Sequence, residues 1–213
     1  LASHPTQPDS NSPSNAPNIM VYFGSGQYLV DADKSSTDVQ SFYGVWDKGD
    51  DSLISTDLIE QTFDSNFSGR VLTRNPVDYS LDYGWYFDLP TTGERAVTSP
   101  IARADTVFFN SFVPEEDPCS AGGFGFKFAV DMTTGGSPLK PVIDSNNDGI
   151  IDVNDYQTDA GGNQSTLAAV RQEGFLPEPV FIEDLAFTAE IATKVKALQN
   201  IPSGRFSWQE LIH

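Results

Sequence analysis

The sequence predicts an all-β protein, and two observations about composition and spacing are the main grounds. Aromatic residues make up 12% of the 213 residues, and Gly (17) and Pro (14) are frequent. Aromatic side chains favour strands, whereas glycine and proline favour the turns between them. Between residues 19 and 136, short apolar or alternating runs recur with turn residues separating them, and no convincing helical periodicity interrupts them.

Eight segments in this range are predicted as strands. They are residues 19–24, 40–46, 58–63, 70–74, 84–89, 95–101, 106–113 and 123–131. Strands at this spacing favour a sandwich, a barrel or the blades of a propeller. A four-stranded blade takes roughly 40 residues, so about three fit in this range, too few to close a propeller alone. The chain is therefore either a partial propeller completed by another chain or not a propeller.

The two ends of the chain differ from this central region. Residues 1–18 are rich in Pro, Ser and Asn and predict a flexible arm or linker, which leaves 19–213 as the folded part. Residues 164–174 suggest a short helical turn, 180–182 a strand, and 185–198 either a strand or a helix. The chain starts without a signal peptide, so we expect a processed product or a piece of a longer protein.

Charge and cysteine content exclude several classes of function. The formal net charge is −18, which opposes binding to nucleic acid or to an anionic membrane surface. No stretch of 18 apolar residues is available to span a bilayer. Cys119 is the only cysteine, so no disulfide forms within the chain. It is expected to be a small buried apolar residue or to pair with a cysteine elsewhere.

The most specific motif is the segment from Asp144 to Asp155. Its oxygen-bearing side chains occupy the ligand positions of an EF-hand-type loop, and Gly149 falls where such a loop turns sharply. Calcium takes six to eight oxygen ligands. The predicted ligands are the side chains of Asp144, Asn146, Asp148, Asp152 and Asp155 and the carbonyl of Ile150.

Three interpretations of this loop stay open from the sequence. It is an acidic turn without metal, a structural calcium site, or a regulatory site whose occupancy changes an interaction. Carboxylates crowded into one loop repel each other unless a cation is present, which favours the two calcium interpretations. Asp at the last position is one methylene shorter than the usual Glu, so Asp155 must approach more closely or bind through one oxygen.

No catalytic site is predicted, and the chain is expected not to be an enzyme. His4 and His213 are the only histidines and lie at the two ends. Acidic pairs such as Glu115-Glu116 and Asp50-Asp51 lie in turns and are expected to be solvated. An aromatic group is expected mainly in the core, with a sugar-binding platform as the alternative; it comprises Phe42, Tyr43, Trp46, Trp85, Tyr86 and Phe87.

Several segments, taken in order, resemble the C-terminal region of the PilY family of type IV pilus biogenesis and tip-adhesin proteins. They are VYFGSGQYLVDAD (21–33), QSFYGVWDKG (40–49), GWYFDLPTTGERAVTSPIAR (84–103), VFFNSFVPEEDPCSAGGFGFKFAVDMTTGG (107–136), VIDSNNDGIIDVNDY (142–156) and GRFSWQEL (204–211). The resemblance implies the last blades of a β-propeller with the calcium loop inserted between strands. It also implies a role in pilus assembly, in the balance of extension and retraction, and in adhesion.

The resemblance further implies where the protein acts and with what. The expected partners are minor pilins or other components of the pilus tip, and the rest of its own propeller, in the same chain or a separate one. The expected location is extracellular, at the pilus tip or associated with a bacterial outer membrane. The chain lacks the Arg-Gly-Asp motif of some family members, so integrin binding is not expected. The alternative is a carbohydrate- or partner-binding module of an extracellular protein with a structural calcium site.

Overall fold

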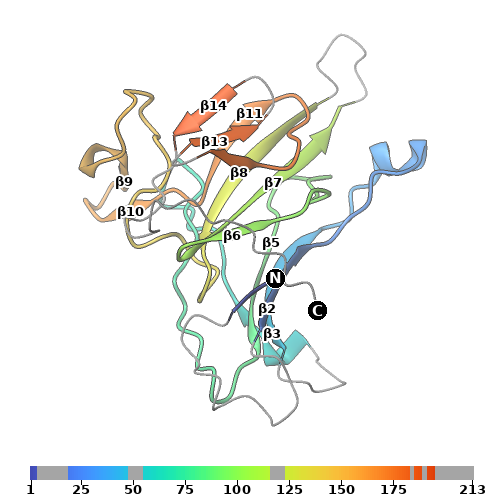
Figure 1. Ribbon diagram of the computed structural model, residues 1–213, viewed down its shortest axis with the longest axis horizontal. Coiled ribbons are helices and arrows are strands. Elements are labelled where there is room, and N and C mark those ends of the chain that lie inside the picture. The colour runs from blue at the N-terminus through green and yellow to red at the C-terminus, as the bar shows by residue number, and fades with distance from the viewer. Residues whose placement is uncertain (4–18, 48–54, 116–122, 183–184, 189–190, 195–213) are drawn as a thin grey trace, which may run out of the picture.

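The computed structural model describes residues 1–3, 19–47, 55–115, 123–182, 185–188 and 191–194. In these residues the fold is all-β, as predicted, and helical structure is limited to short 3₁₀ turns at Asp31–Ser35, Ser55–Asp57 and Val153–Asp155 (Figure 1). No helix in the described ranges is long and apolar enough to cross a bilayer. Cys119, His4, His213, Glu116, Asp50 and Asp51, on which predictions were made, lie outside the described residues.

Two larger sheets carry most of the structure. The first has the order β1-β2-β3-β5-β4, all antiparallel except the β4–β5 pair. Its strands are β1 (Ala2–Ser3), β2 (Ile19–Gly24), β3 (Ser41–Asp47), β4 (Ile59–Glu60) and β5 (Gly84–Asp88). The second has the order β11-β8-β7-β6. Its strands are β6 (Ile101–Arg103), β7 (Thr106–Pro114), β8 (Gly123–Asp131) and β11 (Ala169–Glu173).

Two smaller sheets complete the described structure. One is a hairpin of β9 (Tyr156–Thr158) and β10 (Gln164–Thr166). The other joins β12 (Val180–Ile182), β13 (Leu185–Thr188) and β14 (Ile191–Lys194) as an antiparallel meander. Phe181 of β12 packs edge-on against Phe108 of β7, with ring centroids 4.9 Å apart, so the meander contacts the second large sheet.

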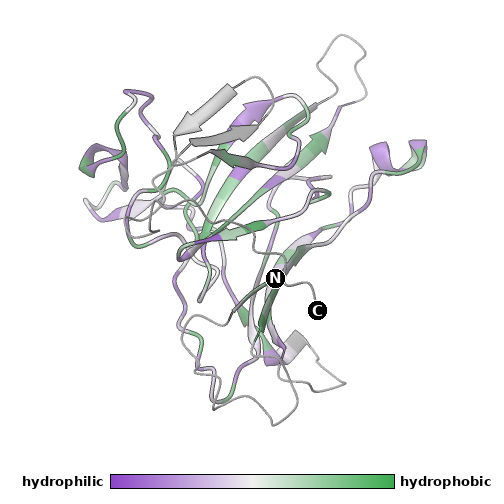
Figure 2. Ribbon diagram, viewed as in Figure 1, coloured by the Kyte–Doolittle hydropathy of each residue, from purple (hydrophilic) through white to green (hydrophobic). Residues whose placement is uncertain are grey.

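Aromatic side chains from both large sheets form the main core. Phe42 of the first sheet stacks on Phe109 of the second with centroids 3.7 Å apart, and Phe109 stacks in turn on Phe128 at 4.4 Å. Trp85 and Phe87 are fully buried beside them. Buried residues alternate with less buried ones along β2, β3 and β5, because each strand turns one face inward. Figure 2 shows hydrophobic residues along the strands of both large sheets.

The structure differs from the predicted elements in several places. Of the predicted strand 58–63 only Ile59–Glu60 forms a strand, and the predicted strand 70–74 contains only isolated bridges, at Arg70 and Leu72. Residues 164–174 contain strands β10 and β11 rather than a helical turn, and the ambiguous segment from 185 contains strands β13 and β14. The run 95–101 forms an isolated bridge at Arg95, which pairs with Phe112, and enters a strand only at Ile101. Ala2 and Ser3 form β1, although the sequence predicted an arm there. Within the described ranges no sheet closes on itself.

Lys127 provides a prediction for the pH dependence of stability. It lies on β8, is 9% exposed, and burial lowers the pKa of its ammonium group to about 8. Because the pKa is lower in the folded than in the unfolded state, the charged ammonium group costs stability in the folded state, and this cost is present in full below about pH 8. Stability should therefore rise between about pH 8 and 10 as this group loses its proton in the folded state.

The Lys127→Met variant should be more stable than the parent at pH 7 and should lose most of this rise. Urea midpoints measured from pH 7 to 10 test it, with Lys34→Met as the control, since Lys34 is exposed in an ion pair with Asp31. Parallel pH profiles for the parent and Lys127→Met would contradict the prediction.

Candidate metal centre

The candidate calcium loop, Asp144 to Asp155, connects β8 to β9 and is anchored where it begins. Val142 and Ile143 are buried against Phe108 and Ala129 of the second large sheet. Just upstream, the guanidinium of Arg74 donates to the carbonyl groups of Ser137 and Pro138. The loop itself projects beside the β9–β10 hairpin (Figure 1). A long polar loop is thus attached to the body by an apolar residue pair and a cation.

Asp155 is the organising residue of the loop. It is 1% exposed, and its Oδ1 accepts hydrogen bonds from the Ser145 amide at 2.7 Å, from the Ser145 hydroxyl and, more weakly, from the Asn146 amide. Its Oδ2 accepts from the Asp152 amide at 2.9 Å. One buried carboxylate therefore ties the beginning of the loop to its end.

The turn at the middle of the loop has the conformation expected from its sequence. Gly149 has φ +83° and Asn147 has φ +60°, both in the left-handed region that glycine and asparagine tolerate best. The Gly149 amide donates to Oδ2 of Asp144 at 2.8 Å, which folds the turn back over the first residue of the loop. The other oxygen of Asp144, Oδ1, is buried and has no hydrogen-bond partner among the described residues.

The remaining predicted ligands make local hydrogen bonds. Oδ1 of Asn146 accepts from the Asp148 amide, Oδ1 of Asp148 from the Ile150 amide, and Oδ1 of Asp152 from the Asn154 amide, all between 2.7 and 2.9 Å. The Ile150 side chain is 60% exposed. These contacts fix the backbone of the loop and leave the second oxygens of Asp148 and Asp152 directed to side-chain amides.

The predicted ligands do not converge on one point. Among the described residues, no group of three or more carboxylate, imidazole or thiol side chains has the arrangement of a metal site. The fit to calcium therefore rests on chemistry and on one atom. The donor set is entirely oxygen, as calcium requires, and Asp144 Oδ1 is a buried carboxylate oxygen that nothing in the described structure satisfies. The chemistry of these residues therefore suits a calcium ion, and its binding stays a prediction.

The aromatic group divides between the core and the opposite face of the first sheet. Phe42, Trp46, Trp85 and Phe87 are buried, as expected. Tyr43 and Tyr86 lie on the opposite face of the sheet, where their rings stack on each other with centroids 5.9 Å apart. The four buried rings are not available to stack on a sugar, so a sugar platform built from this group would have to use Tyr43 and Tyr86.

Two buried charged clusters were not found by sequence reasoning. Glu94 accepts two hydrogen bonds from the Arg70 guanidinium, at 2.7 and 2.8 Å. Arg95 donates to the carbonyl groups of Gln27, Asp33 and Ser36. Amides of Leu29 and Val30 bond the Asp33 carboxylate and hold its pKa below the usual range. The partners of Arg70 and Arg95 in these clusters lie 24 to 68 residues away in the chain, and no local spacing marks such pairs.

Comparison with known proteins gives one consistent result. No protein-family profile matches the chain. A type IV pilus biogenesis factor PilY1 homolog of Xylella fastidiosa is 32% identical over 135 residues, which cover 58% of this chain and 9% of the relative. Type IV pilus biogenesis factor PilY1 of Pseudomonas aeruginosa is 29% identical over 162 residues, which cover 62% of this chain and 14% of the relative. The chain thus spans less than a fifth of the length of either relative.

A solved structure agrees with these matches at the level of the fold. The crystal structure of the Pseudomonas aeruginosa PilY1 C-terminal domain superposes with a TM-score of 0.70 at 23% identity. The match covers 84% of this chain and 41% of that chain. The predicted resemblance is therefore confirmed: the chain is similar in sequence to PilY1-type type IV pilus biogenesis factors, and its fold is similar to that of the PilY1 C-terminal domain.

Proposed function

We propose that this chain is a calcium-binding, non-enzymatic part of a type IV pilus protein that acts in pilus assembly, in the control of extension and retraction, and in surface adhesion. The pilus role is supported by the names of its relatives in Xylella fastidiosa and Pseudomonas aeruginosa. The calcium role is supported by one observation in this chain: Asp144 Oδ1, at the first ligand position of the loop, is a buried carboxylate oxygen without a partner among the described residues.

The proposed division of labour within the loop follows from its hydrogen bonds. Asp144, Asn146, Asp148 and the Ile150 carbonyl would hold the ion at the exposed end of the loop, and Asp152 would complete the shell with Asp155. Asp155 already binds four loop donors, so one of its oxygens would be shared between the ion and the Ser145 amide. Calcium supplies positive charge that offsets repulsion among the carboxylates and orders the loop. An ordered loop presents a fixed surface to a partner.

The calcium proposal predicts a large effect of Asp148→Ala. The parent protein should melt at a higher temperature in excess calcium than in EGTA, because an ion that binds only the folded state stabilises it. Asp148→Ala should abolish this difference while leaving the melting temperature in EGTA nearly unchanged, since Asp148 makes only exposed, local hydrogen bonds. Differential scanning calorimetry with and without calcium measures both values.

Asp159→Ala is the matched control for this experiment. Asp159 also lies in an Asx-rich turn, where it accepts from the Gly161 and Asn163 amides, but outside the candidate loop. This variant should keep the full calcium-dependent shift. A parent melting temperature that is the same with calcium and EGTA would refute the calcium proposal.

The wider proposal concerns architecture, location and partners. The two larger sheets would be the last blades of a β-propeller that further polypeptide completes, at the cell surface or pilus tip, in contact with minor pilins. Loss of the protein from its host should reduce the number of surface pili, and complementation with the Asp148→Ala form should separate the calcium role from the pilus role. Normal piliation in the deletion strain would argue against a part in assembly.

A further inference from the structure

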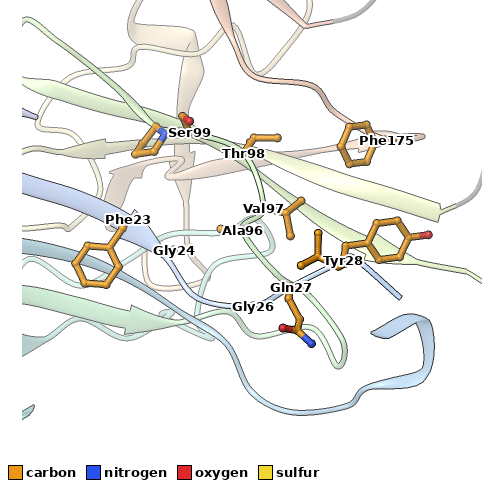
Figure 3. Close-up of a pocket in the computed structure, with 12 residues that line it drawn as sticks. Phe23, Gly24, Gly26, Gln27, Tyr28, Ala96, Val97, Thr98, Ser99 and Phe175 are labelled. Carbon is orange, nitrogen blue, oxygen red and sulfur yellow. The ribbon is translucent and has the colours of Figure 1, made fainter. Parts of the chain in front are cut away.

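Two surface features lie outside the candidate metal centre, a cavity and a modification motif. The cavity has a volume of about 560 Å³ and lies between the Phe23–Leu29 segment and residues 96–100, with Phe175 beside them (Figure 3). Among the described residues that line it, none carries a charged side chain, so the cavity does not point to one class of ligand. The motif is more specific, because its side chains define the chemistry that recognises it.

Asn66, Phe67 and Ser68 form the pattern Asn-x-Ser, which marks an acceptor of N-linked glycan in the surface loops of secreted proteins. Asp64 precedes the asparagine by two positions. Bacterial enzymes that transfer such glycans require an acidic residue at that position, where it pairs with a cation of the enzyme, and a hydroxyl group two positions after the asparagine. Residues 64–68 therefore supply the amide, the carboxylate and the hydroxyl that such an enzyme recognises.

The motif lies at the tip of a loop whose two arms are tied together. Phe63 and Leu72 form an antiparallel bridge at the base of the loop. Residues 64–69 belong to no strand or helix, and Asn66 and Ser68 are both exposed. An enzyme can therefore take up the acceptor segment while the arms that hold the loop stay in place.

The contacts that Asp64 makes with Asn66 are local and exposed. Oδ1 of Asp64 accepts from the Asn66 backbone amide at 2.9 Å and from its side-chain Nδ2 at 2.7 Å. The Phe67 amide donates to the Asp64 carbonyl at 3.3 Å, which closes the turn. Exposed hydrogen bonds exchange with water at little net cost. Both functional side chains can therefore turn from each other to an enzyme without disturbing the core.

Asn163 begins a second Asn-x-Ser pattern that lacks two of these properties. Gly161 stands two positions before it, where the bacterial enzymes require an acid. Its hydroxyl residue, Ser165, belongs to β10 and pairs with Gln157 of β9. The backbone of this second motif must leave a sheet before an enzyme can bind it. The chain thus contains its own comparison for the first motif.

We propose that Asn66 is the acceptor of an N-linked glycan, which an oligosaccharyltransferase of the bacterial envelope transfers from a polyprenyl-pyrophosphate-linked oligosaccharide. Asn66 Nδ2 forms a bond to the anomeric carbon of the first sugar. The bond from that carbon to the pyrophosphate oxygen breaks, its electron pair leaves with the polyprenyl pyrophosphate, and one amide proton passes to a carboxylate of the enzyme. The inference rests on the surface location in the proposed function, because these enzymes act on exported proteins.

Export of the 213-residue chain beside such an enzyme tests the proposal. The chain is fused to a secretion signal and expressed in a laboratory bacterium that carries the transferase and its lipid-linked oligosaccharide. Peptide mass spectrometry should find the oligosaccharide mass on Asn66 and none on Asn163. Asn66→Gln should abolish the modification and Asn163→Gln should leave it unchanged. Asp64→Ala should reduce it about tenfold or more, because the enzyme loses a charge-assisted contact.

The melting temperatures of Asn66→Gln and Asp64→Ala should equal that of the parent, which separates recognition from folding. An unmodified Asn66 overturns the proposal if a peptide of the same motif on the same signal is modified. Equal modification of the parent and Asp64→Ala, or of Asn66 and Asn163, also overturns it. The fused signal exports the chain whatever its native location, so an unmodified chain here contradicts this inference alone. Normal piliation in the deletion strain contradicts the proposed function alone.

Discussion

Replacing Glu94 with alanine should lower the free energy of unfolding by about 3–5 kcal/mol, because it leaves the Arg70 guanidinium buried without its counter-charge. The Glu94 side chain is fully buried, and that of Arg70 is 13% exposed. Besides its two bonds to Arg70, Glu94 accepts from the Ser111 hydroxyl and from the Thr91 amide. The Glu94 carboxylate therefore connects three parts of the chain: Arg70, the turn that begins at Thr91, and Ser111 of strand β7.

The surroundings of Arg70 prevent its guanidinium from reaching water or another carboxylate easily when Glu94 is removed. Its guanidinium carbon lies 3.1 Å from the centre of the Phe126 ring and is also near Phe63 and Phe128. The backbone of Arg70 forms a bridge with Ala169 of β11, so the residue cannot move far without opening the sheet edge. A cation over aromatic rings is stabilised by them, but not enough to replace a bidentate carboxylate.

Urea unfolding measures this effect, and two further variants interpret it. Glu173→Ala removes an exposed pair with Arg171 and should change stability by less than about 1 kcal/mol. The double variant Arg70→Met, Glu94→Leu should recover much of the loss, because a buried ion pair is replaceable by apolar side chains of similar size. A Glu94→Ala variant with a urea midpoint like that of Glu173→Ala would show that the buried pair contributes little.

The strands were predictable from sequence wherever one face of the sheet is buried. In β2, β3 and β5 the alternation of apolar residues matches the buried face, and the predicted limits agree with the observed ones to within a residue. The segment 164–174 was misassigned because Ala168 and Ala169 are compatible with a helix. Their burial against β8 and the Arg70–Ala169 bridge decide in favour of a strand, and those partners lie far away in sequence.

The candidate site was predictable in its residues but not in its internal arrangement. Spacing alone identified Asp144, Gly149 and Asp155, because an EF-hand-type loop is a local motif. The sequence could not show that Asp155 faces inward and bonds the Ser145 and Asp152 amides, whereas Asp148 is left at the exposed end. Which of these carboxylates is buried depends on how Val142 and Ile143 attach the loop to the second sheet, and that attachment is a matter of tertiary packing.

Because Asp155 is buried and Asp148 is exposed, we expect the second large effect from replacing Asp155. Asp155→Ala should disorder the loop even without calcium, because it leaves the Ser145 and Asp152 amides without their charged acceptor. Each hydrogen bond to a buried charged group contributes about 1.5–3 kcal/mol, so the local free energy of opening should fall by at least that amount. In EGTA, amide hydrogen exchange of Ser145 and Asp152 should accelerate at least tenfold.

Asp148→Ala is the matched comparison, since it alters the same loop by the same chemical change. It should leave the exchange of the Ser145 and Asp152 amides in EGTA unchanged while removing the response to calcium. Asp155→Ala should remove both the slow exchange of these amides in EGTA and the response to calcium. If the two variants behave alike in EGTA, Asp155 is not the organising residue of the loop. If Asp155→Ala keeps its calcium response, the ion is held by the exposed half of the loop, Asp144 to Ile150, without the residue that closes it.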